Sequence, residues 1–269
     1  MIAVVDYQKG NLKSVERGLI AAGGEAFITA DASEIAKADA IVLPGVGAFA
    51  DAAATMCELG QMEAIRDRVR AGVPFLGICL GEHLMFEHGV EGAPEGNPAC
   101  GLGLLPGTVV AMPRCDAQGK AFKVPHVGWN TIEMPSCNGG VTVPPCGEGG
   151  GNAVLSSGGA GGGAARSSAA KRGLFEHGAF PGSTPQPGSD LAFACPLFDG
   201  IAPGEYFYFT HSFIAPTGSH TIAETTHSTR FTSAVQYGDR AFGVQFHPEK
   251  SSDAGARVLA NFVAIAARG

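Results

Sequence analysis

One cysteine and one histidine-glutamate pair carry the residue types and spacing that could do chemistry in this chain. Cys79 is the centre of Gly77-Ile78-Cys79-Leu80-Gly81, between an apolar run and a probable helix. Glycine two residues away on both sides is typical of a strand-to-helix turn that lifts the middle side chain above a sheet edge. At a helix N-terminus and beside an imidazole, the thiolate can be populated near neutral pH. Cys79 is therefore a candidate nucleophile.

The best candidate base is His247, in the string Gln245-Phe246-His247-Pro248-Glu249. Glu249 lies two residues after His247, and in an extended segment this spacing brings both side chains to the same side. The carboxylate can then orient the ring and stabilise the imidazolium. The three residues together predict a Cys-His-Glu triad.

A third string could bind the negative charge that develops in acyl transfer. Pro44-Gly45-Val46-Gly47 directly follows the apolar run 40–43, and glycines there let backbone N–H groups turn toward a ligand. The N–H of Leu80, next to the nucleophile, is a natural second donor. Each string alone has an ordinary explanation, a buried thiol or a plain turn. Their combination favours a nucleophilic site.

Short apolar runs and helical periodicities indicate the elements that must position these residues. Strands are expected at 2–5, 26–29, 40–43 and 73–78, helices after the capping candidate Asn11 and at 51–71 and 80–87, then a hairpin of 232–237 and 241–246 and a helix at 253–267. The early alternation predicts an α/β fold, with an open, mostly parallel sheet flanked by helices and an antiparallel hairpin extension. Ligands gather at the carboxyl ends of such strands, so the loops after 43 and 78 can converge.

Composition agrees with a soluble enzyme. The 269 residues are 45% hydrophobic and 16% charged, and the net charge of −7 argues against a nucleic-acid partner. The seven cysteines have irregular spacing without a Cys-x-x-Cys pair, so we expect no metal site and a reducing cytoplasm.

The apolar stretch after Met1 is too short for a signal peptide or a membrane span.

The stretch 136–190 differs in kind, because it holds 15 of the 40 glycines and 5 of the 17 prolines. That composition predicts a low-complexity, disordered insertion rather than part of a core. We expect residues 1–269 to form one domain that this insertion interrupts, since long surface insertions raise the loop-closure entropy only slowly.

The motifs resemble those of the class I (triad) glutamine amidotransferases, which have a flavodoxin-like fold. Further strings are similar to the glutaminase subunits of imidazole glycerol phosphate synthases, which act in histidine biosynthesis. These strings are Asp6-Tyr7, Gly10-Asn11-Leu12, Pro44 to Phe49, His126 to Asn130, Tyr208 to Ser212 and Gly243 to Ser251. The resemblance covers the whole chain except the insertion, which the family replaces with a much shorter connection.

The resemblance implies hydrolysis of glutamine to glutamate and ammonia, without a cofactor. Cys79 would attack the amide, and His247 would protonate the departing ammonia. The residues that would hold the oxyanion and the substrate are Gly45, Val46, Gly47, Leu80, His83, His211, Ser212 and Phe213. The chain departs from the family at His83, where glutamine is usual, and at Glu82, where methionine is common. Imidazole offers fewer hydrogen bonds than an amide, so glutamine binding should be weaker, unless His83 only packs beside the turn.

The resemblance also implies a cyclase partner, a (βα)8 barrel that receives ammonia through a protected channel in a heterodimer. Asn11 and Trp129 would face this partner, although Trp129 could equally be a core aromatic. Two other functions remain open at this point. The chain could be the glutaminase subunit of anthranilate or aminodeoxychorismate synthase, or a non-catalytic regulatory subunit that has kept the fold.

Overall fold

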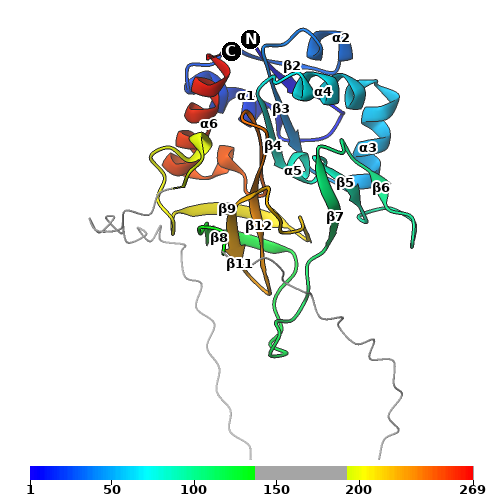
Figure 1. Cartoon of the computed structure of the whole chain (residues 1–269), viewed down its shortest axis with the longest axis vertical. Coiled ribbons are helices and arrows are strands. Elements are labelled where there is room, and N and C mark those ends of the chain that lie inside the picture. The colour runs from blue at the N-terminus through cyan, green and yellow to red at the C-terminus, as the bar shows by residue number, and fades with distance from the viewer. Residues whose placement is uncertain (137–192, 269) are drawn as a thin grey trace, which may run out of the picture. The chain divides into compact units, whose positions relative to one another are not determined.

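A seven-stranded sheet organises the residues that the computed structural model describes, which are 1–136 and 193–268. Apart from Ser136, the predicted insertion at 136–190 lies outside these residues. The strand order is β11-β12-β13-β4-β3-β1-β2 (Figure 1). The strands are β1 (Ile2–Val5), β2 (Ala26–Thr29), β3 (Ala40–Gly45), β4 (Phe75–Cys79), β11 (Thr221–Thr226), β12 (Arg230–Tyr237) and β13 (Ala241–Val244).

The sheet has the predicted mixture of strand directions. Strands β2, β1, β3, β4 and β13 run parallel to their neighbours in this order, whereas β12 pairs antiparallel with both β13 and β11. The hairpin from β12 to β13 closes where Tyr237 pairs with Ala241, as the sequence predicted. The prediction of an open, mostly parallel sheet with an antiparallel extension is therefore confirmed.

Helices cover both faces of the sheet (Figure 1). They are α1 (Leu12–Ala21), α2 (Ala32–Ile35), α3 (Phe49–Glu58), α4 (Gln61–Arg70), α5 (Leu80–His83) and α6 (Ser252–Ala266). Alternate residues of β1 point to opposite faces: Val4 packs with the buried residues of α1 and α6, and Val5 packs with those of α2, α3 and α4. The strands are thus buried on both faces, as expected for a parallel sheet.

Three expectations about helices were wrong. The helix predicted over 51–71 is interrupted at Gly60, which has a φ of +69° between α3 and α4. The helix predicted over 80–87 stops at His83, because Phe86 is buried and starts β5 (Phe86–Gly89), whose hydrogen bonds to β7 (Leu105–Ala111) replace helical ones. Asn11 occupies the N-cap position of α1 but makes no capping bond, since its backbone lacks the extended conformation of a capping residue.

The described residues also form two smaller sheets, which the sequence did not predict. One has the order β10-β7-β5-β6, with β6 at Ala99–Cys100 and β10 at Phe213–Ile214; the other pairs β8 (His126–Thr131) with β9 (Tyr206–His211). Short 3-10 helices lie at η1 (Pro196–Phe198) and η2 (Pro248–Lys250). Among the residues described, none of the helices is both long and apolar enough to span a membrane.

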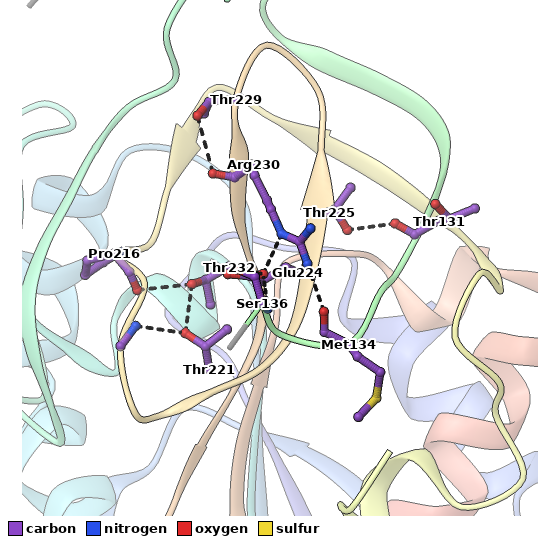
Figure 2. Close-up of polar contacts among 11 residues, drawn as sticks. Thr131, Met134, Ser136, Pro216, Thr221, Glu224, Thr225, Thr229, Arg230 and Thr232 are labelled. Atoms are coloured by element: carbon purple, nitrogen blue, oxygen red, sulfur yellow. Dashed lines mark hydrogen bonds and ion pairs between the residues drawn. The ribbon is translucent and has the colours of Figure 1, made fainter. Parts of the chain in front are cut away.

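The chain next to the glycine-rich segment is anchored to the β11–β12 hairpin (Figure 2). Buried Glu224 accepts hydrogen bonds from the backbone N–H of Ser136 at 2.8 Å and from its hydroxyl at 3.1 Å, and it pairs with Nε of Arg230 at 2.5 Å. Arg230 also donates to the Met134 carbonyl at 2.9 Å. These contacts fix the described chain up to Ser136.

Candidate active site

The turn at Cys79 has the geometry that the sequence predicted. Strand β4 ends at Cys79 and α5 begins at Leu80, and Cys79 has φ 55° and ψ −107°, a strained conformation for a residue with a side chain. A Cβ on Gly77 would lie 2.5 Å from the Gly81 carbonyl oxygen, and one on Gly81 would lie 1.8 Å from that of Leu43. Both flanking glycines are therefore required sterically.

His247 reaches the same sheet edge from the segment after β13, the strand beside β4. Its Nδ1 donates to Glu249 Oε1 at 3.0 Å, and both side chains are almost fully buried. The residues between them form the turn of η2, not the extended segment expected from the spacing, so the carboxylate reaches back across Pro248. The Ser251 hydroxyl donates to the His247 carbonyl at 2.6 Å and holds this turn.

The charge on the His247 ring is set by its neighbours. Burial alone lowers the pKa of His247, but its interactions with Cys79 and with Glu249 outweigh burial and raise the pKa to about 9. Within the described residues, no hydrogen bond to Nε2 is formed, yet the interaction with the Cys79 sulfur contributes most to the raised pKa. At neutral pH the ring is an imidazolium and can give up a proton.

A cavity of about 450 Å³ opens over Cys79. Its walls include most of the residues that the sequence analysis selected: Val46, Gly47, Cys79, Leu80, His83, His211, Ser212, Phe213 and His247. Gly45 and Glu249 do not line it; Gly45 ends β3, and Glu249 binds His247. Residues such as Met1 and Arg240 line a larger cavity of about 570 Å³, but none of the residues selected from the sequence lies in its walls.

The backbone expected to bind an oxyanion is only partly directed at this cavity. The Val46 N–H donates to the Tyr7 hydroxyl at 3.2 Å, and a Cβ on Gly45 would meet that hydroxyl at 2.6 Å. Burial raises the pKa of Tyr7, so the phenol stays protonated. The N–H of Leu80 begins α5, and the first amides of a helix have no partner within it. Leu80 is thus the better placed donor in this structure.

His83 and Gln245 form a polar pair beneath the cysteine. Nε2 of His83 lies 2.7 Å from Gln245 Oε1, and Gln245 Nε2 donates to Cys79 Sγ at 3.7 Å. Burial lowers the pKa of His83 to about 4, although Gln245 opposes this shift. No role for Gln245 is predicted from the sequence, where its place two residues before His247 is the only signal.

Glu82 is buried beside this pair without a partner. Neither of its carboxyl oxygens has a hydrogen bond among the described residues. Burial, and then the proximity of Cys79, raises the pKa of Glu82 well above its ordinary value. A buried carboxyl group of this kind is kept neutral rather than charged.

Hydrogen bonds also define the wall formed by His211, Ser212 and Phe213. Nδ1 of His211 donates to the Phe213 carbonyl at 2.8 Å, so Nε2 accepts from Nδ1 of His126 at 3.0 Å. Nε2 of His126 in turn lies 3.3 Å from the Asn130 amide. Burial is the main reason that the pKa values of both histidines are lowered, and both rings are therefore neutral. Each neutral ring carries one N–H, and the hydrogen bonds above fix which nitrogen has it.

The two residues expected at a partner interface lie on the surface or near it. Trp129 on β8 is 42% exposed, so its interpretation as a core aromatic was wrong. It packs edge-to-face on Tyr208, with ring centroids 6.1 Å apart. Asn11 is half-buried at the start of α1. Within the described ranges, no group of three His, Cys, Asp or Glu residues could hold a metal ion.

Comparison with known proteins gives a consistent result. The family model for "Glutamine amidotransferase class-I" matches residues 3–143 and 167–266. The imidazole glycerol phosphate synthase subunit HisH of Moorella thermoacetica is 36% identical over 97% of this chain and 93% of its own length. The subunit of the same name from Rhodopirellula baltica is 35% identical, covering 97% and 96%.

Solved structures agree on the fold. A crystal structure of a glutamine amidotransferase superposes with a TM-score of 0.58 at 16% identity, covering 99% of this chain and all of the other. With strands, turn and pocket arranged as described, the chain belongs to the class I glutamine amidotransferases, in the family of imidazole glycerol phosphate synthase HisH subunits.

Proposed function

We propose that this chain is the glutaminase subunit of an imidazole glycerol phosphate synthase. It hydrolyses L-glutamine to glutamate and ammonia and delivers the ammonia for imidazole glycerol phosphate formation in histidine biosynthesis. The names of its relatives support the pathway. The single observation that carries the chemistry is the Cys79 sulfur in a cavity beside a charged His247 ring that Glu249 holds.

Cys79, His247 and Glu249 divide the reaction among them. The Cys79 thiolate attacks the carbon of the glutamine side-chain amide and forms a tetrahedral intermediate. The His247 imidazolium donates its proton to the amide nitrogen, the C–N bond breaks, and ammonia leaves a thioester. Neutral His247 then takes a proton from water, whose oxygen displaces the thiolate and gives glutamate. Glu249 keeps Nδ1 bonded throughout.

The oxyanion is held by backbone amides around Gly45, Val46, Gly47 and Leu80. Because the Val46 N–H is bonded to Tyr7, a contribution from Val46 requires that this bond opens, and the positive φ of Gly47, +99°, makes a local turn possible. Leu80 supplies the other donor without rearrangement. Formation of the oxyanion site thus depends on Tyr7, which lies in the loop after β1.

Glutamine itself is bound by the polar wall of the cavity. Both ring nitrogens of His211 are occupied by His126 and Phe213, so His211 shapes the wall. The Ser212 hydroxyl makes no hydrogen bond within the described residues and lines the cavity, so it is free to bind the substrate. His83 presents the ring atom that Gln245 does not use.

The partner is a cyclase with a (βα)8 barrel, and the complex is a cytoplasmic heterodimer. Asn11 and Trp129 face the cyclase. The exposed apolar residues Val127, Trp129 and Tyr206 on paired β8 and β9 support this assignment, because exposed aromatic residues on one surface are typical of protein interfaces.

A glutaminase assay of the reconstituted complex tests this function. Glutamate and ammonia are measured for the chain with a purified cyclase subunit and its nucleotide. We expect turnover that the cyclase stimulates and that Cys79→Ala reduces by about 10⁵-fold. Cys57→Ala, at an exposed cysteine of α3, is the matched control and should retain full activity.

The same assay separates the enzyme from a non-catalytic regulatory subunit, which the unusual Glu82 and His83 favour. A regulatory subunit would bind the cyclase without releasing ammonia. Equal rates for Cys79→Ala and the unmodified chain would also contradict the proposal.

A further inference from the structure

Gln245 is a buried polar residue of the site that the mechanism above does not use. It follows β13, where Val244 lies beside Ile78 of β4, so Gln245 comes next to Cys79. Its side chain has no exposed surface, and its backbone N–H donates to the Ser233 carbonyl at 3.0 Å. A buried carboxamide needs partners for both its acceptor and its donors.

The carboxamide of Gln245 joins His83 to the nucleophile. Its Oε1 lies 2.7 Å from His83 Nε2, and its Nε2 donates to Cys79 Sγ at 3.7 Å. The sulfur also lies 3.9 Å from the Thr210 carbonyl, which can accept the thiol proton but can donate nothing. When Cys79 is ionised, Gln245 is therefore the side-chain amide that can donate to it.

One orientation of the carboxamide suits both His83 and an ionised Cys79. The His83 ring is neutral, because burial lowers its pKa to about 4, and it therefore has one N–H. With that proton on Nε2, Gln245 Oε1 accepts it and the NH₂ group faces Cys79. The reverse orientation would put a carbonyl oxygen against a thiolate, where two acceptors repel each other. When the sulfur is ionised, only one direction of hydrogen bonding satisfies all three groups.

We propose that Gln245 is a positioning residue for the nucleophile: oriented by His83, its carboxamide donates a hydrogen bond to ionised Cys79 and holds the sulfur at the cavity. The inference deepens the proposed function and rests on it only for its consequence in glutamine turnover. The reactivity of the thiol itself can be measured without glutamine. A donor to an anion makes a stronger bond than a neutral pair, so the effect falls mainly on the ionised sulfur.

The test is the alkylation rate of Cys79 in the purified full-length chain. Iodoacetamide is added at pH 7, and modification of the peptide that carries Cys79 is followed by mass spectrometry. We expect Gln245→Leu to lower the rate about ten-fold, the effect of losing one hydrogen bond to a charged group. Gln245→Glu keeps the acceptor for His83 but presents negative charge to the sulfur, and should lower the rate at least as much.

A matched control lies on the neighbouring strand. Gln236 of β12 is also a glutamine, but its Nε2 donates to the Gly238 carbonyl at the hairpin turn, and Gln236→Leu should leave the alkylation rate unchanged. His83→Leu frees the carboxamide without removing it, so a decrease of about three-fold is expected, smaller than for Gln245→Leu. In the complex, Gln245→Leu should lower kcat and leave KM for glutamine within about twofold.

An unchanged alkylation rate in folded Gln245→Leu overturns the positioning role, even if glutamine turnover is lost. If this variant does not fold, unchanged rates in Gln245→Glu and His83→Leu overturn it in the same way. Slower alkylation in these variants, together with no glutamine hydrolysis by the unmodified complex, would instead reject the proposed function and leave the positioning role standing.

Discussion

Two buried histidines line the cavity at Cys79, and their polar neighbours differ. His247 binds a carboxylate and His83 binds a carboxamide. Burial lowers the pKa of both rings, yet the pKa of His247 rises to about 9 and that of His83 falls to about 4. The neighbouring groups, Cys79 and Glu249 for His247 and the Gln245 amide for His83, therefore decide whether each buried imidazole carries charge or serves as a neutral hydrogen-bonding group.

The buried carboxyl groups of Glu249 and Glu82 also differ in their partners. Glu249 forms an ion pair with His247, whereas both oxygens of Glu82 lack a hydrogen bond among the described residues. On the side of the site that follows the family pattern, the buried carboxylate is paired with an imidazolium, and one of its two oxygens makes the hydrogen bond. The side that departs from this pattern contains an unpaired buried acid, which costs stability. Changes on the two sides should thus have different consequences.

The largest effect is expected on the side where the carboxylate is paired with His247. Glu249→Gln keeps an acceptor for His247 Nδ1 but removes the negative charge, so the imidazolium is less stable. We expect kcat for glutamine hydrolysis in the complex to fall about 10³-fold. Glu58→Gln, at an exposed position of α3, is the control. A decrease of less than about tenfold would show that the carboxylate does not support the ring.

The pH profile should follow the charge on His247. The ring donates a proton to the departing ammonia, so kcat should fall as the pH rises through about 9, where the imidazolium is lost. In Glu249→Gln this decrease should move to lower pH, because one of the groups that raise the pKa is gone. An alkaline limb at the same pH in both proteins would contradict the assignment.

On the other side, removing the unpaired acid should stabilise the protein. The unfolded Glu82 carboxyl ionises near its ordinary pKa of 4.5, but the folded one does so only at higher pH. Between these values the unfolded state has lost the proton and the folded state has kept it, so stability falls as the pH rises. Glu82→Met should raise the free energy of unfolding at pH 7 by about 1–3 kcal/mol.

Urea unfolding at pH 5 and pH 8 measures this difference. The gain from Glu82→Met should be larger at pH 8, and Glu58→Met, at an exposed position, should give no comparable gain. A destabilised Glu82→Met protein would mean that the carboxyl group has a favourable partner after all.

The smallest effect is expected at His83. A glutamine side chain can donate to Gln245 and still offer further hydrogen bonds to the substrate. His83→Gln should therefore lower KM for glutamine about three-fold, as measured by steady-state glutamate formation at pH 7. An unchanged or higher KM would show that the histidine binds glutamine as well as the amide does.

Local patterns were enough to predict much of the fold and the central turn. The apolar runs that became β1, β3 and β4 are bounded by turn residues, and the glycines around Cys79 occupy positions where a side chain would clash with the backbone. Errors arose where tertiary contacts override a local preference. Phe86 joins a second sheet instead of extending α5, and Gly60 separates two helices within one helical periodicity.

Long-range side-chain contacts were beyond sequence reasoning. The bonds of Gln245 to His83 and to Cys79 join residues far apart in the chain, and no local spacing predicts them. The same holds for the Tyr7 hydroxyl that binds the Val46 amide. Residue types indicated the chemistry, but the partners of each group required the three-dimensional structure.

The most direct test of the account is an NMR titration of the His247 side chain in the isotopically labelled chain. We expect the ring to stay protonated until about pH 9, and Cys79→Ala and Glu249→Gln each to lower the pKa of His247. Titration of His247 at or below its ordinary pKa of 6.5, unchanged by either substitution, would contradict it.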